Sequence, residues 1–161
     1  MAGSERVGRR IMVAVDESEE SMYALQWAVD NLVNKKEHEQ IIIMHAEAPA
    51  VSKLALAGHA AASAGHHVLD IAGRSENLTT QRVFSLARDI CEKSNVSVET
   101  KVMTGETQYA ICEAANELKV DILVVGTHGH GALKRAVVGS VSDYCTRHCK
   151  CPVLVIKKPH H

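Results

Sequence analysis

The sequence predicts an α/β fold, an open five-stranded parallel sheet with strand order 3-2-1-4-5 and helices on both faces. The first observation is a series of five short apolar runs, of which four are nearly continuous, as is typical of strands covered on both faces. The second is that segments with helical spacing of apolar residues lie between the runs. This alternation builds a parallel sheet with right-handed crossovers. We expect residues 1–161 to form a single domain.

Each predicted element is placed by its apolar residues. Strands are expected at 11–15, 41–46, 96–102, 121–126 and 152–156. The third run alternates apolar and polar residues, so we expect it at an edge of the sheet. Three apolar stripes predict helices, and they comprise Met22, Leu25, Val29, Leu32 and Val33; Val83, Leu86, Ala87, Ile90 and Cys91; and Ile111, Ala114, Ala115 and Leu118. A last helix is expected to begin near Ser140.

One segment departs from this alternation. Residues 47–74 are rich in alanine, glycine, serine and histidine, and the segment is longer than a normal connection. His59, His66 and His67 are residues of a metal-ligating type, but nothing in their spacing fixes a geometry. We therefore expect 47–74 to be a flexible insertion, such as a mobile lid.

The composition excludes several classes of protein. The formal net charge is −1 and aromatic residues make up 3% of the chain. A protein that binds nucleic acid needs a basic face or aromatic stacking platforms, so no nucleic-acid partner is expected. No stretch reaches membrane-spanning length, and no apolar signal core precedes Asp16. We expect a soluble, cytoplasmic protein with no membrane partner.

The five cysteines suggest two roles. Cys91 and Cys112 fall in predicted helices, where they would act as small hydrophobic residues. The stretch CTRHCKC contains residues of zinc-ligating type, namely Cys145, His148, Cys149 and Cys151. It lacks a second pair at the spacing of a zinc finger, so no metal site is predicted. Reduced thiols are expected, as in most cytosolic proteins.

Two predicted strand ends are expected to face one crevice. In an open parallel sheet, ligands bind beyond the carboxyl ends of the strands, where the winding order reverses. With order 3-2-1-4-5, that point lies between the first strand, which is followed by Asp16, and the fourth, which ends at Gly126. Gly126 and Gly129 would let the backbone approach a ligand closely and turn with positive φ.

The beginning of the last predicted helix adds an anion site. The residues SVSD after Gly139 resemble a capping box, with Asp143 in place of glutamate. The unpaired N–H groups of Ser140, Val141 and Ser142 would point toward a negatively charged ligand at a helix N-terminus, and a polyphosphate suits this position. The glycine spacing matches neither a Walker P-loop nor a dinucleotide-binding GxGxxG motif.

A known family carries the same pattern. The spacing Gly126-x2-Gly129-x9-Gly139-Ser140, with Asp16 after the first strand and CPVLVIK near the C-terminus, resembles the ATP-binding branch of the universal stress protein family. The resemblance covers about residues 11–157 and is greatest to the plant members. It implies ATP as the ligand, and Mg²⁺ could accompany the phosphates.

The resemblance also implies roles for individual residues. The contacts to ribose and phosphates would come from Gly126, Gly129, Gly139, Ser140 and Val141. Asp16 would meet the ribose or adenine side, and Ala14 and the backbone at Ala46 would border the base. Asp16 could instead cap the first helix with Ser18. The cationic side chains of the loop, which are His128, His130, Lys134 and Arg135, could reach a triphosphate or form a solvated face.

The leading functional interpretation is an ATP-binding stress-response protein that acts as a nucleotide-dependent sensor or switch. No catalytic residue is predicted, and the alternatives are a slow ATPase and a redox-sensitive chaperone-like oligomer that uses the C-terminal thiols.

Residues 153–156 would form an unprotected apolar sheet edge, so we expect a homodimer through the last strand. The variant Gly139→Val is expected to abolish nucleotide binding with little loss of fold, because its side chain would block the phosphates and resist positive φ.

Overall fold

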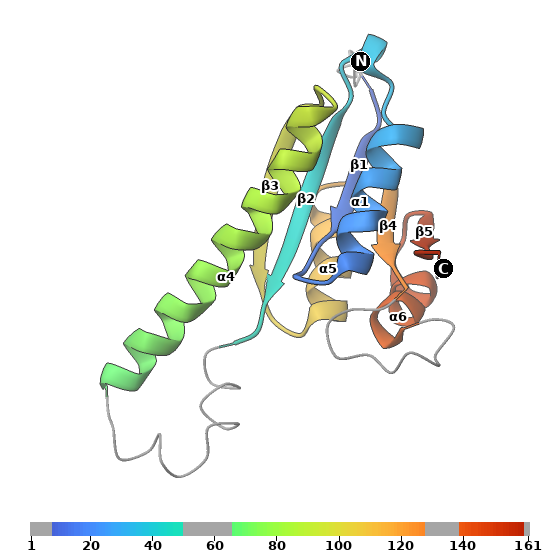
Figure 1. Ribbon diagram of the computed structural model, residues 1–161. Coiled ribbons are helices and arrows are strands. Elements are labelled where there is room, and N and C mark those ends of the chain that lie inside the picture. Colours follow the sequence, from blue (N-terminus) through green and yellow to red (C-terminus); the bar gives the residue numbers. More distant parts are fainter. Residues whose placement is uncertain (1–7, 50–65, 128–138, 160–161) are drawn as a thin grey trace, which may run out of the picture.

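The computed structural model describes residues 8–49, 66–127 and 139–159, which form a sheet covered by helices (Figure 1). The strands of this part of the chain are β1 (Arg10–Ala14), β2 (Gln40–Glu47), β3 (Val98–Thr104), β4 (Ile122–Gly126) and β5 (Val153–Ile156). They pair in parallel in the order β3-β2-β1-β4-β5. The predicted fold class and strand order are confirmed.

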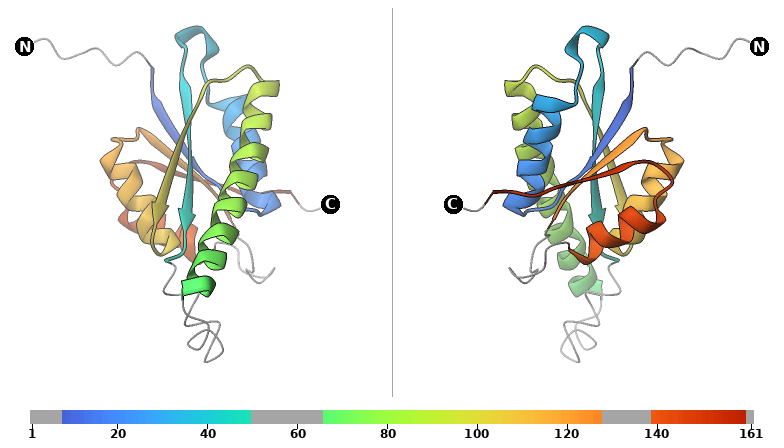
Figure 2. Two further views of the ribbon diagram at one scale, coloured as in Figure 1. Left: turned by 90° about the vertical axis from the view of Figure 1, so that its left-hand side faces the viewer. Right: turned by 90° about the vertical axis from the view of Figure 1, so that its right-hand side faces the viewer.

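Helices cover both faces of the sheet. They are α1 (Glu19–Asn31), α4 (His66–Lys93), α5 (Thr107–Glu117) and α6 (Ser140–His148), with a short 3-10 turn at Lys35–Glu37. Figure 2 shows α1 and α4 on one face, and α5 and α6 on the other. In the part of the chain that the structure describes, no helix is long and apolar enough to cross a membrane.

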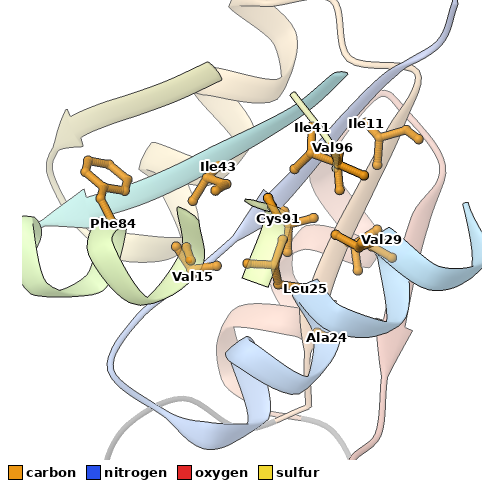
Figure 3. Packing of buried hydrophobic residues seen from close by; sticks show 14 of the residues in the cluster. Ile11, Val15, Ala24, Leu25, Val29, Ile41, Ile43, Phe84, Cys91 and Val96 are labelled. Atoms are coloured by element: carbon orange, nitrogen blue, oxygen red, sulfur yellow. The ribbon is translucent and has the colours of Figure 1, made fainter. Parts of the chain in front are cut away.

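The sheet has an apolar core on each face, which explains why most strands are nearly unbroken runs of apolar residues. Successive strand residues point to opposite faces, so each strand supplies both cores. Under α1 and α4, Ile11 and Ile43 pack with Leu25 and Cys91 (Figure 3). The opposite core joins residues of the sheet to α5 and α6, and it includes Met12, Ile42, Met44, Leu123, Ile111, Ala115 and Cys145.

The edge position of β3 is confirmed, but its expected bounds are displaced. The strand begins at Val98 and not at Val96, and it continues to Thr104. Its residue Val102 is 41% exposed, which an edge strand permits because one side has no neighbour. Leu86 was expected in the buried stripe of its helix, and this expectation is wrong. The helix packs on the sheet through Val83 and Ala87, and Leu86 lies outside that contact, 46% exposed.

The connection after β2 is shorter than the expected insertion over 47–74. Glu47 ends β2, and 66–74 belong to α4. Residues 66–74 contain no proline, and their one glycine, Gly73, lowers the stability of a helix without ending it. Residues 50–65 lie outside the described residues, and the expected flexibility of the segment stays a prediction.

Candidate functional site

A pocket of about 320 Å³ lies at the carboxyl ends of β1, β2 and β4. This is the position that the strand order predicts for a ligand. Eight residues singled out in the sequence line the pocket, namely Ala14, Asp16, Ala46, Gly126, Gly139, Ser140, Val141 and Ser142. Gly129 lies outside the described residues, together with His128, His130, Lys134 and Arg135.

The turn between β1 and α1 holds Asp16 at the pocket. Ser18 is the N-cap of α1, and its side-chain oxygen accepts a hydrogen bond from the Ser21 N–H at 3.2 Å. The Asp16 carboxylate accepts hydrogen bonds from the Ser18 N–H, at 2.8 Å, and from the Ser18 hydroxyl. The Asp16 N–H in turn donates to the Ser21 oxygen at 3.0 Å. Asp16 therefore orders the helix turn and also lines the pocket, so both interpretations from the sequence describe part of its position.

The ends of β1 and β2 are fastened to each other beside this turn. The Val15 N–H donates to the Met44 carbonyl at 2.9 Å, and Nδ1 of His45 lies 2.9 Å from the Val15 carbonyl oxygen. A carbonyl only accepts, so Nδ1 of His45 carries the proton of this hydrogen bond. The His45 ring is buried and meets the edge of Phe84 on α4, with ring centroids 6.2 Å apart. These contacts hold Val15, Met44 and His45 together where they line the pocket.

Thr127 fastens the other side of the pocket. Its N–H donates to the Ile156 carbonyl at 3.2 Å, and its carbonyl accepts from the Gly139 N–H at 2.7 Å. One buried residue thus joins the end of β4, the end of β5 and the beginning of α6. The position of α6 at the pocket follows from these backbone hydrogen bonds.

At the pocket, Gly126 and Gly139 are required by close approach, not by a left-handed backbone. Among the described glycines, positive φ occurs at Gly8 and Gly105, and Gly139 has φ −70°. The expectation of positive φ at Gly126 and Gly139 is therefore wrong. A Cβ on Gly139 would overlap the Thr127 carbonyl oxygen, and a Cβ on Gly126 would lie 3.0 Å from the Glu20 carbonyl oxygen. For this reason Gly139→Val would disturb the fold, contrary to our expectation of little loss.

The first turn of α6 does not form the predicted capping box. Gly139 is the N-cap without a side-chain hydrogen bond, and Ser140 is the first helical residue. The Ser142 hydroxyl donates to the Gly139 carbonyl at 3.0 Å, while Asp143 pairs with Arg147 at 3.2 Å. The box fails because it needs a serine at the N-cap, and the close contact with Thr127 admits only glycine there. The N–H groups at the helix start have no acceptor within the helix, and they border the pocket.

The pocket lining combines an apolar wall with polar groups. The apolar wall consists of Ala14, Val15, Met44, Ala46, Ile111, Val125 and Val141. Asp16 and His45 are the ionisable side chains among the described lining residues. Positive potential in this part of the pocket comes from the N-terminus of α6. An apolar wall, a carboxylate and helix N–H donors suit the base, ribose and phosphate of a nucleotide in turn.

Half of the described lining residues were not among the site residues predicted from the sequence. They are Val15, Ser21, Met44, His45, Thr107, Ile111, Val125 and Thr127. Some could have been found from the pattern, because Thr127 directly follows a strand end and Ser21 stands three residues after the N-cap. Thr107 and Ile111 are one turn apart on α5, and they lie at the pocket because α5 packs over the ends of neighbouring strands.

The cysteines depart from the expectation of reduced thiols. Cys112 of α5 and Cys149 at the end of α6 form a disulfide, with Cα atoms 5.1 Å apart. His148 does not join the zinc ligands weighed from the sequence, because its ring stacks on Tyr144 with centroids 4.0 Å apart. Cys91 is buried as expected, and burial raises the pKa of its thiol to about 11. The other described free cysteines are Cys145 and Cys151.

Known proteins share this fold. Universal stress protein PHOS34 of Arabidopsis thaliana is 31% identical over 164 residues, which cover 94% of this chain and 62% of that protein. This chain thus matches less than two thirds of the length of that relative. A solved universal stress protein family protein from Arabidopsis thaliana, with AMP bound, gives a TM-score of 0.67 at 21% identity and covers 94% of this chain and 93% of its own.

A universal stress protein in complex with cAMP gives a TM-score of 0.66 at 24% identity, over 93% of this chain and 97% of that chain. Likeness at these identities shows a shared fold. The family itself is shown by sequence, because the model of the universal stress protein family matches residues 8–157. The chain is a member of the universal stress protein family.

Proposed function

We propose that this protein binds an adenine nucleotide in the pocket at the ends of β1 and β4. The observation that carries the proposal is the joining of an apolar wall and the N-terminus of α6 in one pocket. Two proteins of the same fold are known with AMP and with cAMP, which supports an adenine nucleotide as the ligand. The base would lie near Ala14 and Ala46, and the ribose hydroxyls near Asp16.

The phosphates would lie at the beginning of α6. Backbone N–H groups of Ser140, Val141 and Ser142 would donate to them, and the absence of a side chain at Gly139 keeps α6 close to Thr127. Gly126 and Gly129 would border the ribose and phosphates. ATP is the proposed physiological ligand, and Mg²⁺ could accompany it through the phosphate oxygens with water completing its shell.

The proposed biological role is a nucleotide-dependent sensor or switch in the stress response, and the proposed location is the cytoplasm. We propose that the working form is a homodimer joined through β5. The position of β5 at the edge of the sheet supports this assembly, because its outer backbone groups have no strand neighbour among the described residues.

A second candidate function is a redox-sensitive chaperone-like oligomer. The disulfide between Cys112 and Cys149 and the nearby thiol of Cys151 favour it. A slow ATPase has weaker support. The Asp16 carboxylate is engaged by Ser18, and Asp143 pairs with Arg147, so neither is positioned as a general base for an attacking water.

Calorimetry with AMP and ATP tests the proposed site with a matched pair of variants. Ala46 lines the pocket at the end of β2, whereas Ala48 is exposed two residues further on. Ala46→Val adds two methyl groups to the pocket wall, and we expect nucleotide affinity to fall by about tenfold or more, as for a clash worth about 1–3 kcal/mol. Ala48→Val should bind like the unaltered protein. Equal affinities for both variants would place the ligand elsewhere.

A further inference from the structure

Three sulfur atoms gather between α5 and α6. The Sγ atoms of Cys112, Cys145 and Cys149 lie within 4.8 Å of one another, and the disulfide joins Cys112 to Cys149. The two disulfide partners stand 37 residues apart in sequence, so the bond links two separate elements. The end of α6 is thereby tied to the middle of α5.

The three cysteines differ in access from solvent. Cys112 and Cys145 are buried, whereas Cys149 is partly exposed. Of the two disulfide partners, Cys149 is therefore the one that a small thiol or disulfide in solution approaches more readily. Exposed disulfides are in general more easily reduced than fully buried ones.

Cys145 is poorly suited to compete for either partner. Burial, together with the neighbouring Cys151, raises the pKa of the Cys145 thiol to about 11, so it stays protonated near neutral pH. It stands one helical turn before Cys149, whose N–H donates to the Cys145 carbonyl at 3.0 Å. Exchange of the bond to Cys145 should therefore be slow, because only a thiolate attacks a disulfide.

Both tied helices also build the pocket. Thr107 and Ile111 of α5 line it, and Ile111 directly precedes Cys112. Ser140, Val141 and Ser142 line it from the other end of α6, whose C-cap is Cys149. Thr127 holds the beginning of α6 and the disulfide holds its end, so the helix is fastened at two points and its tilt is limited.

The contact between α5 and α6 does not depend on the disulfide alone. The rings of Tyr109 on α5 and Tyr144 on α6 meet edge to face, with centroids 5.0 Å apart. Reduction would leave this contact in place, so the helices should stay packed with more freedom to tilt.

We propose that Cys112 and Cys149 form a reversible thiol–disulfide site through which a small disulfide such as glutathione disulfide raises the affinity of the pocket for adenine nucleotide. The effect on the pocket rests on the function proposed above, whereas the thiol chemistry does not. The oxidised form holds α6 in the position seen in the structure, so its N-terminal N–H groups are preorganised for phosphate.

The oxidation proceeds by two thiol–disulfide exchanges. The Cys149 thiolate attacks one sulfur of glutathione disulfide, which forms a mixed disulfide and releases one glutathione thiolate. The Cys112 thiolate then attacks the Cys149 sulfur, which forms the intramolecular bond and releases the second glutathione. Two electrons pass from the protein to glutathione disulfide, and the two protons of the cysteine thiols end on the two released glutathiones. Reduction by glutathione reverses both steps.

The thiol site is tested by equilibrating the protein in a series of glutathione to glutathione disulfide ratios and mapping disulfides by mass spectrometry. We expect one transition, with Cys112 joined to Cys149 on the oxidised side. Cys149→Ser should abolish the transition, whereas Cys151→Ser, at a free and partly exposed cysteine two residues away, should preserve it. A bond from Cys112 to Cys145 would contradict the proposal, as would a tightly bound zinc ion that keeps the reduced cysteines from oxidation.

The effect on the pocket is tested by calorimetry with AMP and ATP on the oxidised and reduced forms of the unaltered protein. We expect about fivefold or greater loss of affinity on reduction, the usual lower range of coupling between sites. Cys149→Ser should bind like the reduced form under either condition. Equal affinities in the two forms would overturn the coupling. Absence of binding in both forms would overturn the proposed nucleotide function instead, and the disulfide mapping would still decide the thiol chemistry.

Discussion

At Gly139 the backbone at the start of α6 lies so close to Thr127 that no side chain fits between them. Gly139→Ala should therefore lower the free energy of unfolding by about 1–3 kcal/mol, the range for overpacking, and weaken nucleotide binding as α6 shifts. Urea unfolding and calorimetry measure the two effects. Ser140→Ala is the control, because it removes an exposed hydroxyl without a clash and should change stability by less than about 0.5 kcal/mol. If Gly139→Ala were as stable as this control, the close contact would be refuted.

Glu39 should make stability depend on pH. Its buried carboxylate accepts hydrogen bonds from the Arg9 N–H at 3.1 Å, the Arg9 side chain at 2.9 Å and the Asn34 N–H at 2.7 Å. The hydrogen bond from the Arg9 side chain is the main cause that lowers the pKa of Glu39 below its usual 4.5. Because the folded pKa lies below the unfolded one, this stabilisation is complete above pH 4.5 and is lost as the pH falls through the folded pKa.

The variant Glu39→Gln isolates this contribution. At pH 7 the free energy of unfolding of this variant should be about 1–3 kcal/mol lower than that of the unaltered protein. This gap between the two proteins should narrow as the pH falls below 4.5. Denaturant unfolding over a series of pH values measures the gap. Glu113→Gln, at an exposed position on α5, should show neither effect. A gap that stays constant with pH would contradict the assignment.

At the scale of elements, the two edges of the sheet should differ in assembly. Val155→Lys on β5 introduces a charge at the proposed dimer contact, and we expect it to yield monomers at micromolar concentration in sedimentation velocity. The control is Val102→Lys on β3, at a more exposed valine (41%) on the opposite edge of the sheet. That variant should remain a dimer. A monomeric unaltered protein, or dissociation of both variants, would contradict assembly through β5.

The central strands were predictable because they are short, apolar and buried on two faces, as at β1 and β4. The extent of α4 was not, since its first residues follow a stretch rich in alanine, glycine, serine and histidine and were included with it in the expected insertion. The N-cap of α6 was misplaced by one residue because the decisive contact, with Thr127, comes from another element. The disulfide joins cysteines 37 residues apart, and no local pattern reports such a pairing.

At the scale of the whole molecule, the protein should hold ATP and hydrolyse it very slowly or not at all. Phosphoryl transfer needs a positioned water and charge compensation that is specific to the transition state, and helix N–H groups also stabilise the bound ground state. Labelled ATP incubated with the protein and Mg²⁺ should be recovered intact. Asp143→Ala should behave identically, since Asp143 pairs with Arg147. Several turnovers per minute, lost in this variant, would identify an ATPase.

The central claim is that an adenine nucleotide occupies the pocket between the ends of β1 and β4 and the start of α6. The most direct measurement is a crystal structure of the protein grown with saturating ATP and Mg²⁺. We predict electron density for the base beside Ala14 and Ala46 and for phosphate within hydrogen-bonding distance of the N–H groups of Ser140–Ser142. An empty pocket at saturating ATP, or ATP bound elsewhere on the molecule, would contradict the claim.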